Sequence, residues 1–426
     1  MASEVSDPSR DRRSAAPFTD GYAPGEPGLR RISVALFAAG LATFALLYST
    51  QPLLPELVRA FAITPGQSVL SVSLCTLGLG LALLFAGPLS EVVGRTGLMH
   101  ASLIASSATA LLGAVAPTWP TLLALRAVEG VLLAGLPAVA MAYLHEEVQP
   151  AHHARAAGLY IGGTAIGGMT GRLVAGGVGD LAGWRWGVAA VAVLGCGCAA
   201  LVWWLLPASR NFHASPAEPR QLVSMTGRLL RDPALLALFA ISATMMGAFV
   251  AVYNAMGFRL TSSAYGLSVG VAGLVFCVYP VGTLTSTYAG RLADRYGRRA
   301  VVPPACVLTL VGLGLTAFAP LPLVVTGLAV MTAGFFAVHG VASGWAAARA
   351  QVGSGATAQA ASLYLFAYYL GSSVFGGLAG TAWASGGWPA VMVLAGALML
   401  IAFAVSLALR RMPSLRERQG SGSFAG

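Results

Sequence analysis

The sequence contains very little charge. Only 9% of its 426 residues are Asp, Glu, Lys or Arg, whereas a soluble domain carries about 25%. Hydrophobic residues make up 57%, and the mean hydropathy is +0.75. Many apolar runs are about 20 residues long, which is the length a helix needs to cross a bilayer, and they do not alternate as barrel strands do. The composition excludes a soluble globular protein and predicts an all-α membrane protein in the lipid bilayer.

Lysine is absent, and all 25 basic residues are arginine. A formal net charge of +10 would suit nucleic acid if the arginines formed one basic surface. Instead, 20 of the 25 fall in alternate loops and tails on one side of the expected spans, and 3 fall on the other. This positive-inside pattern predicts that both termini are cytoplasmic, and it argues against a nucleic-acid partner.

Other absences exclude further classes of protein. The five cysteines lie in apolar runs, without a disulfide framework or metal-ligand spacing. The sequence has no phosphate-binding loop for ATP and no nucleophile–base pair typical of an enzyme. The outer loops are too short for an extracellular domain. We therefore predict no cofactor, no metal and no enzymatic reaction.

Twelve membrane spans are predicted, and a polar central break divides them into two sets of six. The spans are residues 32–55, 68–89, 97–116, 121–144, 155–179, 187–206, 234–258, 268–289, 300–318, 321–346, 358–381 and 389–409. The expected organisation is a disordered cytoplasmic tail (1–30), a first six-helix bundle (31–206), a cytoplasmic loop (207–233), a second six-helix bundle (234–410) and a cytoplasmic tail (411–426).

One short charged string occurs twice. Residues 87–97 read GPLSEVVGRTG, and residues 290–300, which begin 203 positions later, read GRLADRYGRRA. A repeat at half the chain length predicts two pseudo-symmetric bundles around a central substrate site. We interpret the strings as a cytoplasmic latch that holds the two halves in one state, or else as solvated loops that obey the positive-inside pattern. The latch residues are Gly87, Glu91, Gly94 and Arg95 in the first copy and Gly290, Asp294, Arg295, Gly297, Arg298 and Arg299 in the second.

A second repeat supports the same division of the chain. Residues 162–171 read GGTAIGGMTG, and residues 371–380 read GSSVFGGLAG. Glycines spaced four apart along a helix allow another backbone to approach closely. The stripe serves helix packing alone, or it also forms a pliable interface at which the halves slide.

These features resemble the major facilitator superfamily over about residues 30–412. The second charged string resembles the family's motif between spans two and three, and the first string departs from it at Glu91, Val92 and Thr96. LRAVEGVLLAG at 125–135 resembles the family's arginine motif, and span five resembles its antiporter motif with Arg172 in place of proline. Other strings are similar to the YnfM, or acriflavine-sensitivity, branch of drug-efflux-like members. The resemblance implies two inverted-repeat bundles, alternating access and proton coupling.

Charged or titratable side chains inside spans are functional candidates, because burying them in lipid is costly. They are Arg126 and Glu129 in span four, Arg172 in span five and His339 in span ten. Measured along the helices from the loop between spans four and five, Arg126 and Arg172 are expected at a similar distance, about 28 Å. We therefore expect an Arg126–Glu129–Arg172 cluster, which is reduced to a pair if Arg172 faces the other half-bundle.

Two interpretations of this cluster remain open. It is a buried ion network that joins spans four and five, or a coupling site at which Glu129 exchanges a proton. Its formal charge of +1 would also attract an anionic group. His339 is either a proton carrier, since histidine titrates near neutral pH, or a hydrogen-bonded packing residue.

Six further polar or aromatic residues are candidates to line the substrate cavity. They are Tyr48, Gln51, Tyr253, Asn254, Tyr364 and Tyr368. An aromatic cavity with few polar groups suits small amphipathic compounds. The leading hypothesis is a monomeric transporter of the bacterial inner membrane that exports such compounds in exchange for protons. The alternatives are a carrier of small organic anions or sugars and, from another class, a non-transporting membrane sensor or assembly protein.

Overall fold

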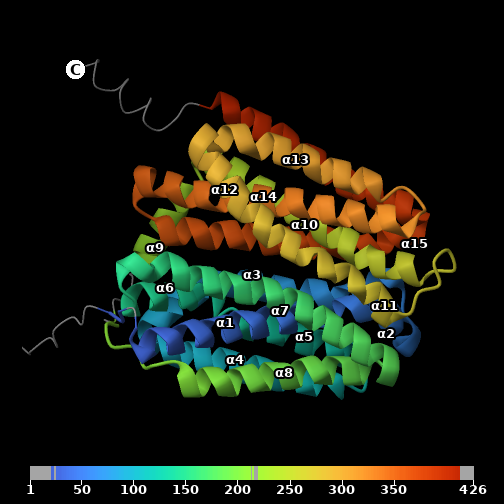
Figure 1. The fold of residues 1–426 in the computed structure, drawn as a ribbon, viewed down its shortest axis with the longest axis horizontal. Coiled ribbons are helices and arrows are strands. Elements are labelled where there is room, and N and C mark those ends of the chain that lie inside the picture. The colour runs from blue at the N-terminus through green and yellow to red at the C-terminus, as the bar shows by residue number, and fades with distance from the viewer. Residues whose placement is uncertain (1–20, 24, 213, 215–218, 413–426) are drawn as a thin grey trace, which may run out of the picture.

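The computed structural model describes residues 21–23, 25–212, 214 and 219–412, and these form helices joined by short loops (Figure 1). The first half contains α1 (Pro27–Leu47), η1 (Gln51–Leu53), α2 (Leu54–Phe61), α3 (Pro65–Val93), α4 (Arg95–Ala114), α5 (Trp119–Leu133), α6 (Pro137–Glu147), η2 (Pro150–His152), α7 (His153–Ala182) and α8 (Trp184–Leu205). After α9 (Pro219–Leu229), the second half contains α10 (Pro233–Thr261), α11 (Val269–Gly273), η3 (Leu274–Val278), α12 (Tyr279–Tyr296), α13 (Arg298–Leu315), α14 (Leu321–Ser354) and α15 (Thr357–Arg411).

The helices form two lobes that lie side by side (Figure 1). Among the residues that the structure describes, ten segments are long and apolar enough to cross a membrane. One of them, α15, contains two helices joined at Gly386 and Gly387, where the backbone leaves the helical region. A further 30-residue helix, α7, is long enough to span, although its glycines and charged residues lower its hydropathy. The predicted all-α fold with two six-span bundles is confirmed.

The predicted spans agree with the helices to within a few residues at most ends. One helix was not predicted: α9 is a short helix inside the predicted 207–233 loop, whose prolines and arginines indicate only a polar break. The predicted first tail lies largely outside the described residues, but α1 already begins at Pro27, and Tyr22 forms a backbone bridge with Val148. Residues 413–426 of the predicted last tail also lie outside the described residues.

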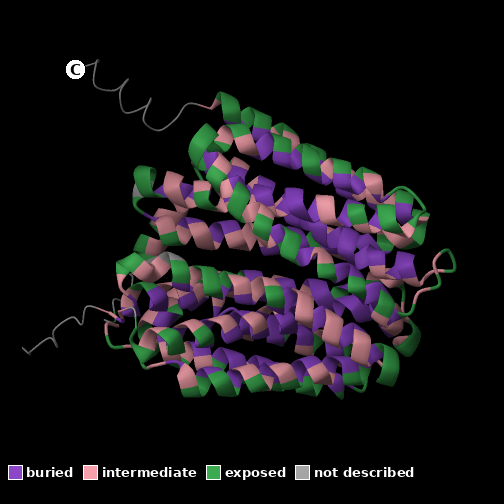
Figure 2. Ribbon diagram, in the orientation of Figure 1, coloured by how far each residue is buried: buried purple, intermediate pink, exposed green. Residues whose placement is uncertain are grey.

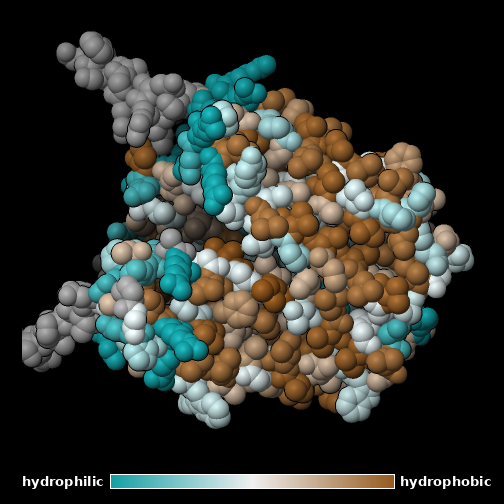
Figure 3. Space-filling model, in the orientation of Figure 1, coloured by the Kyte–Doolittle hydropathy of each residue, from teal (hydrophilic) through white to brown (hydrophobic). Residues whose placement is uncertain are grey.

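The surface separates into an apolar belt and two polar ends. Figure 2 shows exposed residues on the outer faces of the helices and buried residues where the helices meet. Most of the visible outer surface is apolar, and hydrophilic side chains gather near the end where α1 begins and α15 ends (Figure 3). We call this the arginine-rich end, because both charged strings lie there, and the other the opposite end. Figure 3 also shows a hollow between the lobes at the arginine-rich end.

Prolines explain two breaks inside spans. Pro52 and Pro55 cannot donate the backbone hydrogen bonds that would continue α1 into α2, so η1 connects the two. In the second half, Pro280 cannot donate to the carbonyl of Phe276, and η3 separates α11 from α12 there. Short 3₁₀ stretches inside a helix often mark a functional hinge. Both breaks lie toward the opposite end of the bundle.

The glycine stripes bring helices together inside each lobe. A methyl group on Gly163, Gly167 or Gly171 of α7 would overlap backbone atoms of α1. Gly371 of α15 approaches the backbone of α10 as closely, whereas Gly376 faces the side chain of Val250 on α10. Backbones this close exclude any larger side chain. The α7 stripe therefore packs helices within one half, which favours the packing interpretation for that stripe. In α15, by contrast, Gly377 and Gly380 approach Ser73 and Pro65 of α3 in the other half.

Candidate functional site

Arg126 and Glu129 form a buried ion pair in the first half. Arg126 Nη1 lies 2.7 Å from Glu129 Oε2, and each residue is about 1% exposed. The pair is local in origin, because residues three apart on α5 lie on the same face of the helix. The other carboxylate oxygen, Glu129 Oε1, is buried and has no hydrogen-bond partner among the described residues. Glu129 is thus an acid inside a membrane span that uses only one of its two oxygens.

Arg126 also caps the C-terminal end of α1. Its guanidinium donates to the carbonyl oxygens of Leu46 (3.1 Å) and Leu47 (2.6 Å), which are the last two residues of α1. It donates as well to the Ser71 carbonyl at 3.0 Å, on α3. The last carbonyls of a helix have no partner within the helix, and lipid offers none. Arg126 therefore ties α1, α3 and α5 together, a role that sequence reasoning did not identify.

Arg172 is separate from this pair, which corrects the expected three-residue cluster. It is 2% exposed, and it donates to Gln51 Oε1 at 2.5 Å and to the Gly168 carbonyl at 2.7 Å. Its guanidinium lies over the rings of Tyr48 (4.2 Å), Phe276 (4.8 Å) and Tyr279 (4.9 Å). Two of these rings belong to the second half. α7 turns Arg172 toward the other half, which is the arrangement in which the expected cluster is reduced to a pair.

Gln51 and Asn254 join the two halves at the same level. Gln51 Nε2 donates to Asn254 Oδ1 at 2.6 Å, and Asn254 Nδ2 donates to the Gly376 carbonyl at 3.1 Å. The two residues are 203 positions apart, the same offset as the charged strings, so they occupy equivalent places in the two halves. Both are buried and bonded to each other, so they do not face an open cavity in this structure.

Aromatic side chains of the second half form one continuous contact network, which we call the aromatic wall. Its members are Phe249 and Tyr253 of α10, Phe276 of η3, Tyr279 of α12, Phe335, Phe336 and His339 of α14, and Tyr364 and Tyr368 of α15. The hydroxyl groups of Tyr253 and Thr332 lie 2.8 Å apart. The sequence predictions included Tyr253, His339, Tyr364 and Tyr368 but missed Tyr279 and the phenylalanines. Phe249, Phe335 and Phe336 lie three or four residues from Tyr253 or His339, and this spacing was the signal that could have found them.

His339 lies within this wall and contacts no charged partner in the described part of the chain. Its Nδ1 is 3.3 Å from the Tyr364 hydroxyl, and its ring centroid is 4.7 Å from that of Tyr368. His339 and Tyr368 are both half-buried, so parts of their rings face accessible space. These contacts suit a hydrogen-bonded aromatic residue at a cavity surface. The proton-carrier role of His339 stays a prediction.

The first charged string forms an ion network inside one half. Arg95 Nη2 lies 2.6 Å from Glu91 Oε1 and 2.8 Å from Glu146 Oε1. Arg95 also donates to Ser90 Oγ and lies 5.3 Å from the ring of Phe212, in the segment that follows α8. Gly94 turns the chain between α3 and α4 with a φ of 92°, a conformation that glycine adopts at no steric cost.

The second charged string has the same turn but fewer partners. Gly297 has a φ of 85°, and Arg299 Nη1 donates to the Arg410 carbonyl at 3.3 Å. Asp294 is exposed and forms no ion pair with any residue that the structure describes. Within the described residues, no ion pair joins either string to the opposite half. The acids that pair with Arg95 in this arrangement, Glu91 and Glu146, belong to the first half itself, and the latch interpretation stays a prediction.

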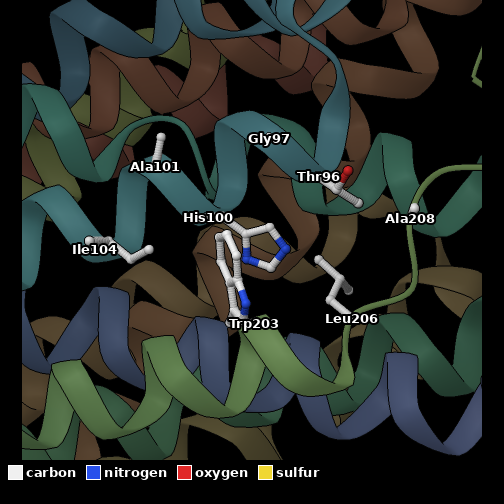
Figure 4. Close-up of a pocket in the computed structure, with 8 residues that line it drawn as sticks. All are labelled: Thr96, Gly97, His100, Ala101, Ile104, Trp203, Leu206 and Ala208. Carbon is white, nitrogen blue, oxygen red and sulfur yellow. The ribbon is translucent and has the colours of Figure 1, made fainter.

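A separate groove lies on the outer side of the first half (Figure 4). It has a volume of about 510 Å³ and lies between α4 and the end of α8, with His100 against Trp203. Most of its lining is apolar, and Trp203 is 60% exposed. It belongs to the lipid-facing surface rather than to the polar centre. Among the described residues, no group of three or more His, Cys, Asp or Glu side chains is placed to hold a metal.

Comparisons with known proteins agree with this architecture. The family model described as Major Facilitator Superfamily matches residues 33–288 and 255–424. The chain is 41% identical over 401 residues to the inner membrane transport protein YnfM of Escherichia coli (strain K12), covering 94% of this chain and 95% of that protein. It is 39% identical over 400 residues to the uncharacterized MFS-type transporter YybF of Bacillus subtilis (strain 168), covering 93% and 98%.

Solved structures share the fold at low sequence identity. A bacterial homolog of the human lysosomal transporter Spinster, in an inward-facing and unoccupied conformation, aligns with a TM-score of 0.69 at 15% identity. The alignment covers 91% of this chain and 98% of that one.

Proposed function

Because the chain belongs to the Major Facilitator Superfamily of membrane transporters, we propose that it exports small amphipathic compounds in exchange for protons. The proposal places the arginine-rich end and both termini in the cytoplasm of a bacterium and the opposite end outside its inner membrane. The protein then works as a monomer by alternating access, with its central site open to one side at a time. Its partners are the small-molecule substrate, protons and the lipid bilayer.

The observation that carries the proposed proton coupling is the position of Glu129. This acid is about 1% exposed within a membrane span, and its Oε1 has no hydrogen-bond partner. Within the described part of the chain its one ion pair is to Arg126, which is also held by backbone carbonyls and so keeps its place if Glu129 takes up a proton. An intramembrane acid of this kind is suited to exchange protons during the transport cycle.

The aromatic wall supports amphipathic compounds as the substrate class. Its rings come from four spans of the second half, and its polar groups are few: tyrosine hydroxyls and the imidazole of His339. Ligand sites with this composition hold an apolar body by contact area and orient it with a small number of hydrogen bonds. Planar compounds would stack on exposed parts of the rings.

The test uses purified protein in liposomes and ethidium, a planar cation whose charge does not change with pH. An acidic lumen should drive ethidium accumulation in the vesicles, and a protonophore should abolish it. Glu129→Gln should retain exchange of ethidium without a gradient but lose accumulation driven by the gradient. Glu56→Gln, which neutralises an acid near the opposite end, is the matched control and should accumulate ethidium normally. Gradient-driven accumulation by Glu129→Gln at the normal level would remove Glu129 from the coupling mechanism.

A second candidate, a carrier of small organic anions, is favoured by one observation. Arg172 is a buried cation, and among the described residues no acid pairs with it. A carboxylate on the substrate would compensate that charge. Binding of 2-naphthoate and ethidium by thermal shift separates the two candidates. Arg172→Gln should abolish a stabilisation by naphthoate if the protein carries anions, and it should leave a stabilisation by ethidium intact if the protein exports cations.

A further inference from the structure

Three side-chain hydrogen bonds join the two halves among the described residues. The first is the Gln51–Asn254 bond described above. In the second, Ser373 Oγ of α15 donates to the Ser73 carbonyl of α3 at 2.6 Å. In the third, Ser268 Oγ donates to Asp180 Oδ2 at 2.7 Å. All three lie in the half of the bundle toward the opposite end, and none joins the halves at the arginine-rich end. The molecule is therefore closed at one end only.

The Gln51–Asn254 bond lies at the centre of this closure. Its two side chains are 1% and 0% exposed, and each is held by a second partner: Arg172 holds Gln51, and Asn254 donates to the carbonyl of Gly376. The resulting chain runs from α7 through η1 and α10 to α15, and so crosses from one half to the other. The two amides occupy equivalent positions, so they meet at the pseudo-symmetry axis between the halves.

Arg172 strengthens the same closure by a different interaction. Its contacts with Gln51, Gly168 and Tyr48 remain within the first half, whereas its contacts with Phe276 and Tyr279 cross to the second. A cation over an aromatic face is attracted more strongly where water is excluded. Phe276 is presented by η3, the 3₁₀ break in its span. Parting the halves would remove two rings from Arg172 but leave it partners in its own half.

We propose that Gln51, Asn254 and Arg172 are positioning residues that keep the opposite end closed while the substrate site is open at the arginine-rich end. This inference rests on the alternating access of the proposed function. For the molecule to open toward the other side, the Gln51–Asn254 bond must break, and Arg172 must leave the two rings of the second half.

Neutral amides suit a closure that opens in every cycle. When the halves part, water enters, and each amide exchanges its partner for water at little net cost. An ion pair buried at the same place would leave two charges to be separated at each opening, which costs far more. The bond is therefore strong enough to close the end in a dry interface and weak enough to be reversible.

The experiment measures separations between spin labels in a background whose five cysteines are replaced. One label pair, at exposed Leu181 and Ala264, reports the opposite end, and a second pair, at Val92 and Tyr296, reports the arginine-rich end. Gln51→Met and Asn254→Leu each remove the amide bond and keep side-chain volume. We expect both to lengthen the first separation and shorten the second. Arg172→Met should shift the distances in the same direction.

Two controls separate the closure from a general loss of packing. Tyr253→Phe removes the Tyr253–Thr332 hydrogen bond, which lies within one half, and should leave both separations unchanged. The exchanged pair Gln51→Asn with Asn254→Gln restores an amide on each side and should resemble the wild type more than either apolar variant does. If one apolar variant does not fold, the other tests the same bond from the opposite half.

The proposal is overturned if the apolar variants keep the wild-type separations, or if Tyr253→Phe shifts them equally. The readout needs no substrate and no proton gradient, so it stands apart from the transport assay. If ethidium is not transported but the separations shift, the substrate and coupling assignments fail and the closure stands.

Discussion

Replacement of Arg126 by methionine tests whether this residue stabilises the fold by holding α1, α3 and α5 together. The change removes the ion-pair partner of Glu129, which has no other among the described residues. It also withdraws the donors from the carbonyls of Leu46, Leu47 and Ser71. Methionine fills much of the same volume without adding a polar atom. Any loss of stability therefore reports the lost charge and hydrogen bonds rather than a cavity.

The magnitude follows from the burial of the pair. Removing one partner of a buried ion pair costs about 3–5 kcal/mol, because the remaining charge is left uncompensated. The total stability of a folded protein is typically about 5–15 kcal/mol, so Arg126→Met should be severely destabilised. The double variant Arg126→Met with Glu129→Met leaves no orphaned charge, and the carbonyls of Leu46, Leu47 and Ser71 lose charged donors, at about 1 kcal/mol each. It should be more stable than Arg126→Met alone.

The assay is chemical unfolding in lipid nanodiscs, followed by tryptophan fluorescence. The expected order of stability is wild type, then the double variant, then Arg126→Met. Lowering the pH from about 8 to about 5 should narrow the gap between the two variants, because the orphaned carboxyl of Glu129 can take up a proton. Equal stability of wild type and Arg126→Met, or a double variant that is less stable than Arg126→Met, would refute the stabilising role of Arg126.

Three further predictions address packing, substrate contact and the charged strings. Gly167→Val should sharply lower the midpoint of thermal unfolding, because the valine side chain would overlap α1. Gly158→Ala, at a position with open space around it, should change the midpoint by little. Similar midpoints for the two variants would contradict the packing argument. In a fluorescence titration, Tyr368→Ala should weaken ethidium binding by about tenfold and Tyr368→Phe by much less, because contact with the ring supplies most of the binding. Equal losses in the two variants would instead implicate the hydroxyl group. Arg95→Ala should lower the free energy of unfolding by about 1–3 kcal/mol, because it removes charged hydrogen bonds. Arg298→Ala, at an exposed position, should have little effect on it. The reverse order in an unfolding titration would show that the network around Arg95 is not stabilising.

The contrast between the two charged strings also changes an expectation about transport. Because the second string keeps the fuller pattern, the sequence alone predicts a larger transport defect for Asp294→Asn than for Glu91→Gln. In this structure the first string is the one with ion pairs, through Glu146, which lies 51 residues from Arg95. The latch role stays a prediction. Its test is the transport rate of both variants, and a larger defect in Glu91→Gln would favour the network seen here.

Much of the fold followed from the chain because lipid allows few backbone structures. A span must satisfy its own hydrogen bonds, so each apolar run of about 20 residues becomes a helix, and the arginines mark its ends. The 203-residue repeat likewise divided the chain into two halves before any contact was known. The breaks at η1 and η3 were less visible, although the prolines that cause them are present in the sequence.

The sequence by itself determined the twelve spans, the two halves and the Arg126–Glu129 pair, because these depend on helix length, repeat spacing and neighbours on one helix face. Only the tertiary structure decided what Arg172 contacts. Counting residues along α7 gives the height of this side chain, but its direction depends on how α7 is rotated against its neighbours. That rotation is set by the glycine contacts with α1, and it turns Arg172 toward Gln51, Phe276 and Tyr279. The closure between the halves was therefore not predictable from spacing alone.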